Sequence, residues 1–135
     1  MGKRYATELC KLSETYSWAL HAPIDPLVAG VSASASLPLV AVGSGGSFSA
    51  AHLSCSLHQY FTGMLSRPLT PLDLVSSTIN LRSVSAMIIS AGGSNIDTVS
   101  AFENAVDREP RRCIVLCLHN TSTLSRLSRA ADAAQ

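Results

Sequence analysis

Two short turns rich in glycine and serine hold the groups best suited to chemistry in this chain. Residues 43–47 are Gly-Ser-Gly-Gly-Ser, and residues 90–95 are Ser-Ala-Gly-Gly-Ser-Asn. Each turn follows an apolar stretch and precedes a helical pattern. Glycine allows positive φ and a close approach of the backbone to a ligand, while a helix start supplies free N–H donors and a partial positive charge. Each turn is therefore a candidate anion site, with a plain tight turn as the alternative.

The common nucleotide and nucleophile motifs do not fit these turns. A dinucleotide fingerprint, GxGxxG, needs its third glycine where the chain has Phe48. A Walker A loop requires a lysine, and no lysine follows Lys11. The nucleophile elbow GxSxG occurs in neither turn. Dinucleotide binding, this type of nucleotide triphosphate binding and serine hydrolase chemistry are therefore not expected, and no cofactor is predicted.

The turns lie within a regular alternation of strands and helices. Apolar stretches predict strands at 37–42, 68–75, 85–89 and 113–118. The two prolines of the second stretch allow only a short edge-like strand before a helical turn at 72–77. Helical spacing predicts helices at 5–20, 25–33, 48–65, 96–106 and 124–134. Right-handed crossovers then give an α/β fold, a three-layer sandwich with helices on both faces of a mostly parallel sheet. Both turns are expected at the carboxyl ends of the strands, where such sheets bind ligands.

Three segments carry a resemblance to a known family. Residues 43–47 are close to the GNGGS turn of sedoheptulose-7-phosphate isomerases, and residues 89–95 resemble a second turn written S-x-S-G-x-T or S-x-S-G-N-S. Ser122-Thr123-Leu124 followed by Ala131-Asp132 is similar to an S-x-L…A-D ending. Over residues 37–132 the chain thus resembles the sugar isomerase (SIS) domain of phosphosugar isomerases and of glucosamine-6-phosphate synthases. The resemblance implies a flavodoxin-like α/β sheet and a phosphorylated sugar as the ligand.

The resemblance also implies which residues bind the ligand. Ser47 and Ser90 are expected to bind the phosphate, and the two turns supply the rest of the set: Gly45, Gly46, Gly92, Gly93, Ser94 and Asn95. The chain departs from the family where Gly92 replaces a serine and Asn95 replaces a threonine or serine. Each hydrogen bond lost to a charged group costs about 1.5–3 kcal/mol, so weaker affinity or a different ligand is expected unless other donors compensate.

Two histidines are the candidates for a catalytic base. Isomerisation of a sugar phosphate needs a group that moves a proton next to a carbonyl. His52 lies on a polar stripe of the helix after the first turn, and His119 follows the last strand. The alternatives are a solvated helix residue for His52 and a capping or packing residue for His119. Two functions therefore stay open: an aldose/ketose or aminosugar phosphate isomerase, and a non-catalytic regulatory sensor or scaffold.

Composition excludes several other classes of function. The formal net charge is +1 and the basic residues are scattered, so no nucleic-acid partner is expected. No apolar run reaches the roughly 20 residues of a membrane span, and a cytoplasmic protein is predicted. The four cysteines, Cys10, Cys55, Cys113 and Cys117, lack CxxC spacing. They are expected to be core thiols, with no metal site.

The length of the chain predicts its domain organisation, and the open edge of the predicted sheet indicates a partner. The chain of 135 residues is predicted to form one domain at 37–135, on which the helices of residues 1–36 pack. SIS domains usually continue from the A-D ending into a fifth strand, whereas this sequence ends at Gln135. The last strand of the sheet is thus expected to be lacking and the edge unpaired, so a homo-oligomer or a second chain is the expected partner that completes the sheet.

Overall fold

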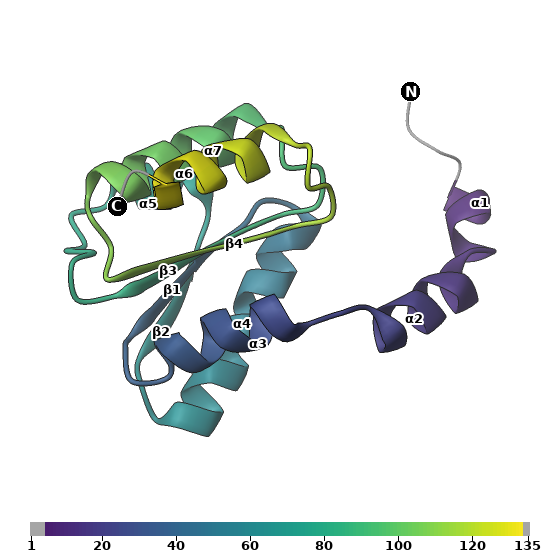
Figure 1. Cartoon of the computed structure of the whole chain (residues 1–135), viewed down its shortest axis with the longest axis horizontal. Coiled ribbons are helices and arrows are strands. Elements are labelled where there is room, and N and C mark those ends of the chain that lie inside the picture. The colour runs from purple at the N-terminus through teal and green to yellow at the C-terminus, as the bar shows by residue number, and fades with distance from the viewer. Residues whose placement is uncertain (1–4, 134–135) are drawn as a thin grey trace.

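One four-stranded sheet organises the molecule, a computed structural model that describes residues 5–133 (Figure 1). The strands are β1 (Leu39–Val42), β2 (Ser66–Leu69), β3 (Ser85–Ser90) and β4 (Arg112–Cys117). The helices are α1 (Tyr5–Leu9), α2 (Leu12–His21), α3 (Asp25–Ser34), α4 (Gly46–Thr62), α5 (Pro71–Ser76), α6 (Ile96–Asp107) and α7 (Thr123–Ala133). The predicted alternation of strands and helices is confirmed from residue 37 onward. Residues 1–4 and 134–135 of the predicted ranges lie outside the described residues.

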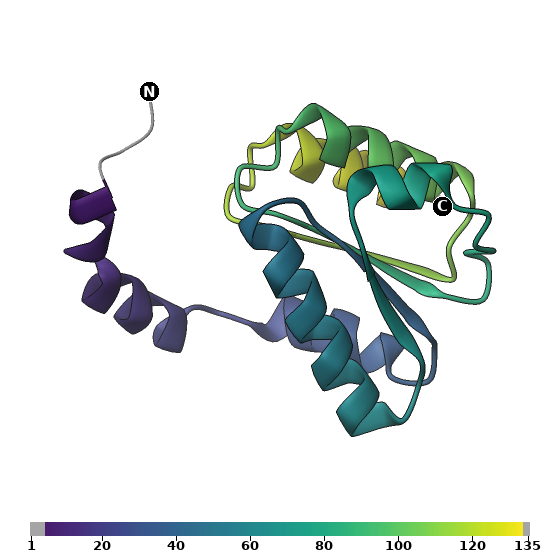
Figure 2. The same ribbon diagram turned by 180° about the vertical axis from the view of Figure 1, so that it is seen from behind.

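The sheet is parallel throughout and has the order β2-β1-β3-β4. Helices α3 and α4 cover one face, and α5, α6 and α7 cover the other (Figures 1 and 2). The predicted three-layer α/β fold is therefore confirmed. The chain passes from β1 outward to β2 and then crosses back to β3, so the winding direction reverses between β1 and β3. In doubly wound sheets this reversal marks the place where ligands bind.

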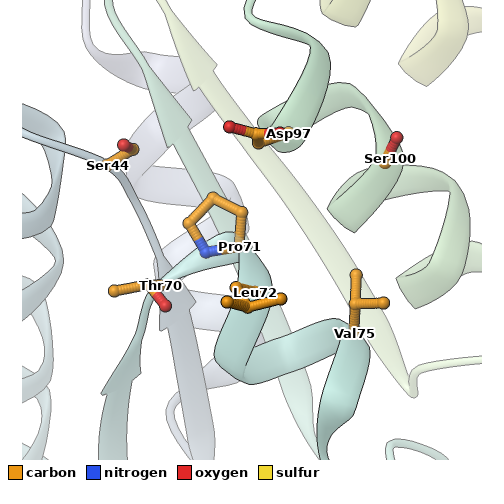
Figure 3. A pocket seen from close by; sticks show the side chains of 7 residues that line it. All are labelled: Ser44, Thr70, Pro71, Leu72, Val75, Asp97 and Ser100. Carbon is orange, nitrogen blue, oxygen red and sulfur yellow. The ribbon is translucent and has the colours of Figure 1, made fainter.

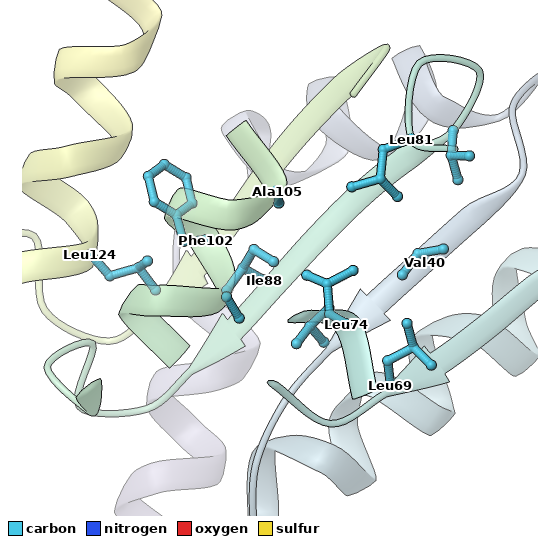
Figure 4. Close-up of a cluster of buried hydrophobic side chains, with 11 residues drawn as sticks. Val40, Leu69, Leu74, Leu81, Ile88, Phe102, Ala105 and Leu124 are labelled. Carbon is cyan, nitrogen blue, oxygen red and sulfur yellow. The ribbon is translucent and has the colours of Figure 1, made fainter. Parts of the chain in front are cut away.

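The core consists of two layers of apolar side chains that the central strands share. All residues of β1 and β3 are buried, as expected for strands covered on both faces. Alternate side chains point to opposite faces. One cluster lies under α5, α6 and α7 (Figure 4) and includes Val40, Val42, Leu74, Ile88, Phe102 and Leu124. The other lies under α3 and α4 and includes Leu39, Ala41, Ala51, Cys55, Met87 and Ile89. These clusters hold the strand ends rigidly in place.

The segment with two prolines forms a short edge strand followed by a helix, as predicted. Pro68 is tolerated in β2 because this strand pairs only with β1. Pro71 occupies the first turn of α5, where its missing N–H costs nothing. Thr70 caps this helix: its hydroxyl donates to the Asp73 carboxylate over 2.6 Å and accepts from the Asp73 N–H over 3.1 Å. The Asp73 carboxylate accepts from the Thr70 hydroxyl and also from the Thr70 N–H, and these two hydrogen bonds lower the pKa of Asp73.

The cysteines differ in their surroundings. Cys55 is buried, and burial raises the pKa of its thiol. Burial, with a smaller effect of the Asp132 carboxylate, raises the pKa of Cys113 to about 11. Cys117 is half-buried. Cys10 is exposed, so its prediction as a core thiol is wrong, because the segment that carries it does not pack on the sheet.

The N-terminal helices are placed in two different ways. Helix α3 lies on the sheet. The Ile114 side chain of β4 packs against Gly30, and its nearest atoms lie 3.6 Å from the place that a Cβ at this residue would take. The predicted helix at 5–20 is divided into α1 and α2, and α2 has no buried residue. Figures 1 and 2 both show α1 and α2 extending away from the sheet. Among the described residues, no helix is long and apolar enough to cross a membrane.

A buried histidine ties three elements together at the amino end of the sheet. The His58 Nε2 donates to the Ser34 carbonyl oxygen over 3.2 Å, and its Nδ1 lies 2.9 Å from the Ser66 hydroxyl. We expect His58→Ala to lower the free energy of unfolding by about 1–3 kcal/mol, because buried polar groups lose their partner. Urea unfolding measures this, with His52→Ala, an exposed position of the same helix, as the control expected to stay within about 0.5 kcal/mol. Equal unfolding midpoints for the two variants would contradict the structural role of His58.

Candidate functional site

The two glycine turns lie side by side at the carboxyl edge of the sheet. Val42 at the end of β1 is the register partner of Ile88 in β3. The chain leaves these neighbouring parallel strands through residues 43–45 and 91–95. The turns therefore flank the point where the winding direction reverses, which is the geometry required for them to act on one ligand.

The first turn needs its glycines for two different reasons. A Cβ on Gly43 would overlap the Ser47 carbonyl oxygen and lie 2.9 Å from the Phe48 nitrogen, so the strand end touches the start of α4. Gly45 has a φ of 57°, which only glycine adopts without strain. The Ser47 N–H donates to the Ser44 carbonyl oxygen over 3.1 Å, whereas within the described chain the N–H groups of Gly45 and Gly46 have no backbone acceptor. Nothing lies within 4 Å of a Cβ built at either glycine, so there is open space beside both residues.

The second turn is held by its own side chains. The buried Ser90 hydroxyl oxygen accepts from the Gly93 N–H over 3.1 Å. Asn95 caps α6, its side-chain oxygen accepting from the Thr98 N–H over 3.1 Å. Ser90 retains its hydroxyl proton for donation to an anion, and Asn95 retains its NH₂ group. Nothing lies within 4 Å of a Cβ built at Gly92, so this turn also leaves room for a ligand.

A third turn, between β4 and α7, supports the second. Gly93 has a φ of 63°, and a Cβ built there would lie 2.7 Å from the Ser122 Cβ. The Leu124 N–H donates to the Gly93 carbonyl oxygen over 2.9 Å. The Ser-x-Leu segment that carried part of the family resemblance thus packs directly against the second glycine turn. Its evident role in this structure is to hold that turn in shape.

A cavity of about 320 Å³ opens beside the first turn (Figure 3). Its lining comes from the segments that follow β1, β2 and β3, and it consists of Ser44, Thr70, Pro71, Leu72, Val75, Asp97 and Ser100. In Figure 3, Pro71 forms the middle of this lining, with Ser44 to one side and Asp97 and Ser100 of α6 to the other. Asp97 is the one titratable side chain in this lining. The Thr70 hydroxyl is already engaged with Asp73, so Ser44, Asp97 and Ser100 are the polar groups left for a ligand.

The turns and the cavity offer complementary chemistry. The free N–H groups of the turns suit an anion, and the helix starts behind them add partial positive charge. The cavity, in contrast, presents a carboxylate and two hydroxyls, which suit the hydroxyl groups of a polyol and repel an anion. A ligand with a phosphate at one end and hydroxyls at the other matches this division. The Asp97 carboxylate is also a group that can accept and return a proton.

The two predicted histidines lie outside the cavity lining. His52 is exposed on α4, and its ring packs edge-on against Phe48 with the ring centroids 4.6 Å apart. His119 is exposed in the turn after β4, where its carbonyl oxygen accepts from the Ser122 N–H over 3.2 Å. Their catalytic role stays a prediction. Among the described residues, no group of three or more His, Cys, Asp or Glu side chains is placed to hold a metal ion.

Sequence reasoning missed Thr70, Asp97 and Ser100 as cavity residues. A signal for two of them was present, because Asp97 and Ser100 follow the second turn at a spacing of three, which places them on one face of a helix. The prediction of Thr70 would have required the position of the end of β2, which is the least regular of the predicted strands. Ser44 lies within the predicted first turn but was not among its expected ligand-binding residues.

Comparison with known proteins identifies the fold. No family model matches the sequence, and no curated protein does. Solved structures match: a candidate sugar-phosphate isomerase from Listeria monocytogenes has a TM-score of 0.65 and 18% identity, covering 93% of this chain and 71% of its own. The tagatose-6-phosphate ketose/aldose isomerase from Escherichia coli has a TM-score of 0.63 and 18% identity, covering 81% of this chain and 33% of its own. This is the sugar isomerase (SIS) fold.

A third match extends the range of SIS-like structures. The glucosamine-6-phosphate deaminase from Thermotoga maritima has a TM-score of 0.61 and 16% identity, covering 66% of this chain and 28% of its own. This chain therefore spans about a third or less of the Escherichia coli and Thermotoga maritima proteins. The SIS resemblance that the sequence predicted from its turns is confirmed at the level of fold.

Proposed function

We propose that this chain binds a phosphorylated sugar at the carboxyl ends of β1 and β3. One observation carries the proposal: two donor-bearing glycine turns leave adjacent strands, and a cavity of about 320 Å³ that contains a carboxylate and two hydroxyls opens beside the first of them. A cavity of this size lies at the small end of the range for ligand pockets, which suits a sugar. The names of the SIS-fold proteins that match, with tagatose-6-phosphate and glucosamine-6-phosphate among them, support the same ligand class.

The proposed binding mode separates the two ends of the ligand. The phosphate lies against Gly45, Gly46 and Ser47 of the first turn and against the Ser90 hydroxyl of the second. The sugar hydroxyls reach Ser44, Asp97 and Ser100 in the cavity. The Asp97 carboxylate disfavours the reverse orientation, with the phosphate in the cavity, by charge repulsion.

The first candidate activity is that of an aldose/ketose or aminosugar phosphate isomerase. In the aldose-to-ketose direction, a base removes the proton on C2 and returns it to C1, while a proton moves from O2 to O1. The Asp97 carboxylate is the cavity group able to carry the carbon-bound proton, and His52 and His119 remain the alternatives from the sequence. The chain would act as a dimer or with a second domain of this kind, in the cytoplasm.

The second candidate is a regulatory sensor or scaffold that binds without turnover. It is favoured by the single titratable group in the cavity and by the absence of the two predicted histidines from its lining. The departures at Gly92 and Asn95 also remove two hydroxyl donors that the family pattern contains. Both candidates share the recognition of a phosphorylated sugar, so binding is tested first.

Thermal unfolding with a panel of sugar phosphates tests the binding proposal. A ligand present at 100 times its dissociation constant stabilises the folded protein by about 2.7 kcal/mol, so at least one aldose, ketose or aminosugar phosphate should raise the melting temperature. Ser47→Ala should remove most of that shift, whereas Ser56→Ala, an exposed position further along α4, should retain it. No shift with any member of the panel, or equal shifts in both variants, would refute this site.

A turnover assay on the ligand that binds separates the two candidates. Proton NMR in D₂O detects both the formation of the isomer and the exchange of the C1 or C2 proton with solvent. An isomerase produces both signals at catalytic enzyme concentration. A sensor binds the same ligand and produces neither, which would leave the binding proposal intact and reject the enzymatic one.

A further inference from the structure

The N-terminal segment formed by α1 and α2 carries apolar side chains that its own sheet does not cover. Every residue of α2 is exposed, including Tyr16 at 67%, Trp18 at 60% and Leu20 at 82% of their full surface. A lone helix of ten residues is marginal in water unless its apolar side chains are buried. Figures 1 and 2 show this segment, which we term the arm (residues 5–21), reaching away from the domain. The arm therefore needs a surface to pack against.

A second uncovered apolar surface lies on the outer side of α3 and α4, termed here the α3–α4 face. Helix α4 has 17 residues and none of them is Asp, Glu, Lys or Arg. Its exposed side chains include Leu53 at 60%, Tyr60 at 82% and Phe61 at 76%. Val28 at 50% and Val31 at 39% are exposed on α3, which covers the same side of the sheet. Large exposed apolar patches of this kind mark interaction surfaces.

The opposite layer of helices shows what a solvated surface of this protein looks like. Exposed side chains of α5, α6 and α7 include the charged residues Asp73, Asp97, Glu103, Asp107, Arg126, Arg129 and Asp132. The α3–α4 face has one exposed charged residue on its two helices, Asp25. The two helical layers of the same sheet thus differ in the number of charged residues that they expose. This difference indicates that the α3–α4 face is covered by another apolar surface in the functional protein.

We propose that a second copy of this chain covers it, with the arm of each copy packed across the α3–α4 face of the other. Each copy carries both the arm and the α3–α4 face. A dimer with two-fold symmetry therefore covers the arm and the face of each copy at the same time. The α3–α4 face has one exposed charged residue, Asp25. The arm, in contrast, has three charged residues, Glu8, Lys11 and Glu14, which must stay at the rim of the interface for the pairing to bury few ionised groups. The interface goes beyond the proposed function and does not depend on it.

The exposed residues of these helices are numerous enough for a stable dimer. Ten residues are exposed on α2, seven on α3 and nine on α4, and these twenty-six, counted over all sides of the three helices, are the most that the helices of one copy could contribute. Stable interfaces involve about 20–30 residues a side. Tyr and Trp, which dominate binding energies at interfaces, are both present, with Trp18 on the arm and Tyr60 on α4. An alternative dimer through the open edge of β4 would leave both of these surfaces uncovered.

A pair of matched substitutions tests the interface by solution mass. Leu53 on α4 and Leu118 beside the β4 edge are exposed to a similar extent, 60% and 64%. Sedimentation of the full chain over a range of concentrations should give a dimer for the parent and for Leu118→Lys. Leu53→Lys should raise the dissociation constant by about tenfold or more, with unchanged far-ultraviolet circular dichroism. A monomeric parent at all concentrations, or a dimer broken by Leu118→Lys and kept by Leu53→Lys, would overturn the proposal.

Tryptophan fluorescence tests the placement of the arm. Trp18 is the single tryptophan of the chain, so its emission reports on the arm alone. The emission should be blue-shifted in the dimer and should move to the red on dilution through the dissociation constant and in Leu53→Lys. Blue-shifted emission that does not depend on protein concentration means that the arm folds back on its own α4, and a blue shift only with phosphatidylcholine vesicles means a membrane partner. Either result overturns the exchange of arms between two copies.

Discussion

Gly43→Ala is expected to abolish the binding of sugar phosphates and to lower the free energy of unfolding by about 1–3 kcal/mol or more. The new methyl group would overlap the Ser47 carbonyl oxygen and lie 2.9 Å from the Phe48 nitrogen. Both are backbone atoms, so the start of α4 must move away from β1 to accommodate it. That movement displaces the N–H groups of the first turn, which are the proposed phosphate donors. Urea unfolding and calorimetric titration with the sugar phosphate measure the two effects.

Gly46→Ala is the control that separates folding from binding. Nothing lies within 4 Å of a Cβ built at Gly46, and this residue has no positive φ. Alanine at this helix start should leave stability unchanged or raise it by up to about 1 kcal/mol. Its methyl group occupies the open space in front of the turn, so binding should still weaken. If Gly46→Ala binds as tightly as the parent, the phosphate does not lie against this turn, and if Gly43→Ala is as stable as the parent, the close packing is wrong.

The fold was largely predictable because its central strands are almost uninterrupted apolar sequence. Residues 39–42 and 85–90 are buried on both faces, and only a parallel sheet between two helical layers requires this. The predicted polar stripe of α4, with Ser49 and His52 among its members, is exposed as expected. The prediction of one helix at 5–20 from helical periodicity was wrong, because this segment does not pack on the sheet and is divided into α1 and α2. The break at Cys10-Lys11 has neither glycine nor proline to signal it.

The candidate site was predictable only where backbone conformation demands a residue type. The two turns could be found because a strand that enters a helix through a tight turn needs glycine, as Gly43, Gly45 and Gly93 show. Asp97 and Thr70 could not be paired from the sequence, because the cavity exists only once three strand ends are in register. His58 could have been recognised as buried, since it lies three residues after Cys55 on the inner stripe of α4.

If the chain is an isomerase, as the first candidate activity proposes, Asp97→Asn is expected to reduce turnover by about 10²–10⁴-fold, because an amide cannot accept the proton that a carboxylate takes. Asp97 is the one titratable group in the cavity lining, and its exposed position on α6 makes its replacement compatible with folding. Loss of a negative charge in the first turn of a helix lowers stability by about 0.3–1 kcal/mol. Glu103→Gln, an exposed position of the same helix outside the cavity, should leave turnover unchanged.

The effects of Asp97→Asn on kcat and on affinity show which role the carboxylate has. If the Asp97 carboxylate moves the proton, kcat falls while KM and the calorimetric affinity change little, because asparagine still hydrogen-bonds the sugar hydroxyls. If it only positions the sugar, affinity falls by roughly ten- to a hundredfold, the loss of one charge-assisted hydrogen bond of about 1.5–3 kcal/mol, and kcat is retained at saturation. Full turnover with full affinity would remove Asp97 from the site. The catalytic base would then have to be sought at His52 or His119, with α4 or the turn after β4 moving toward the ligand.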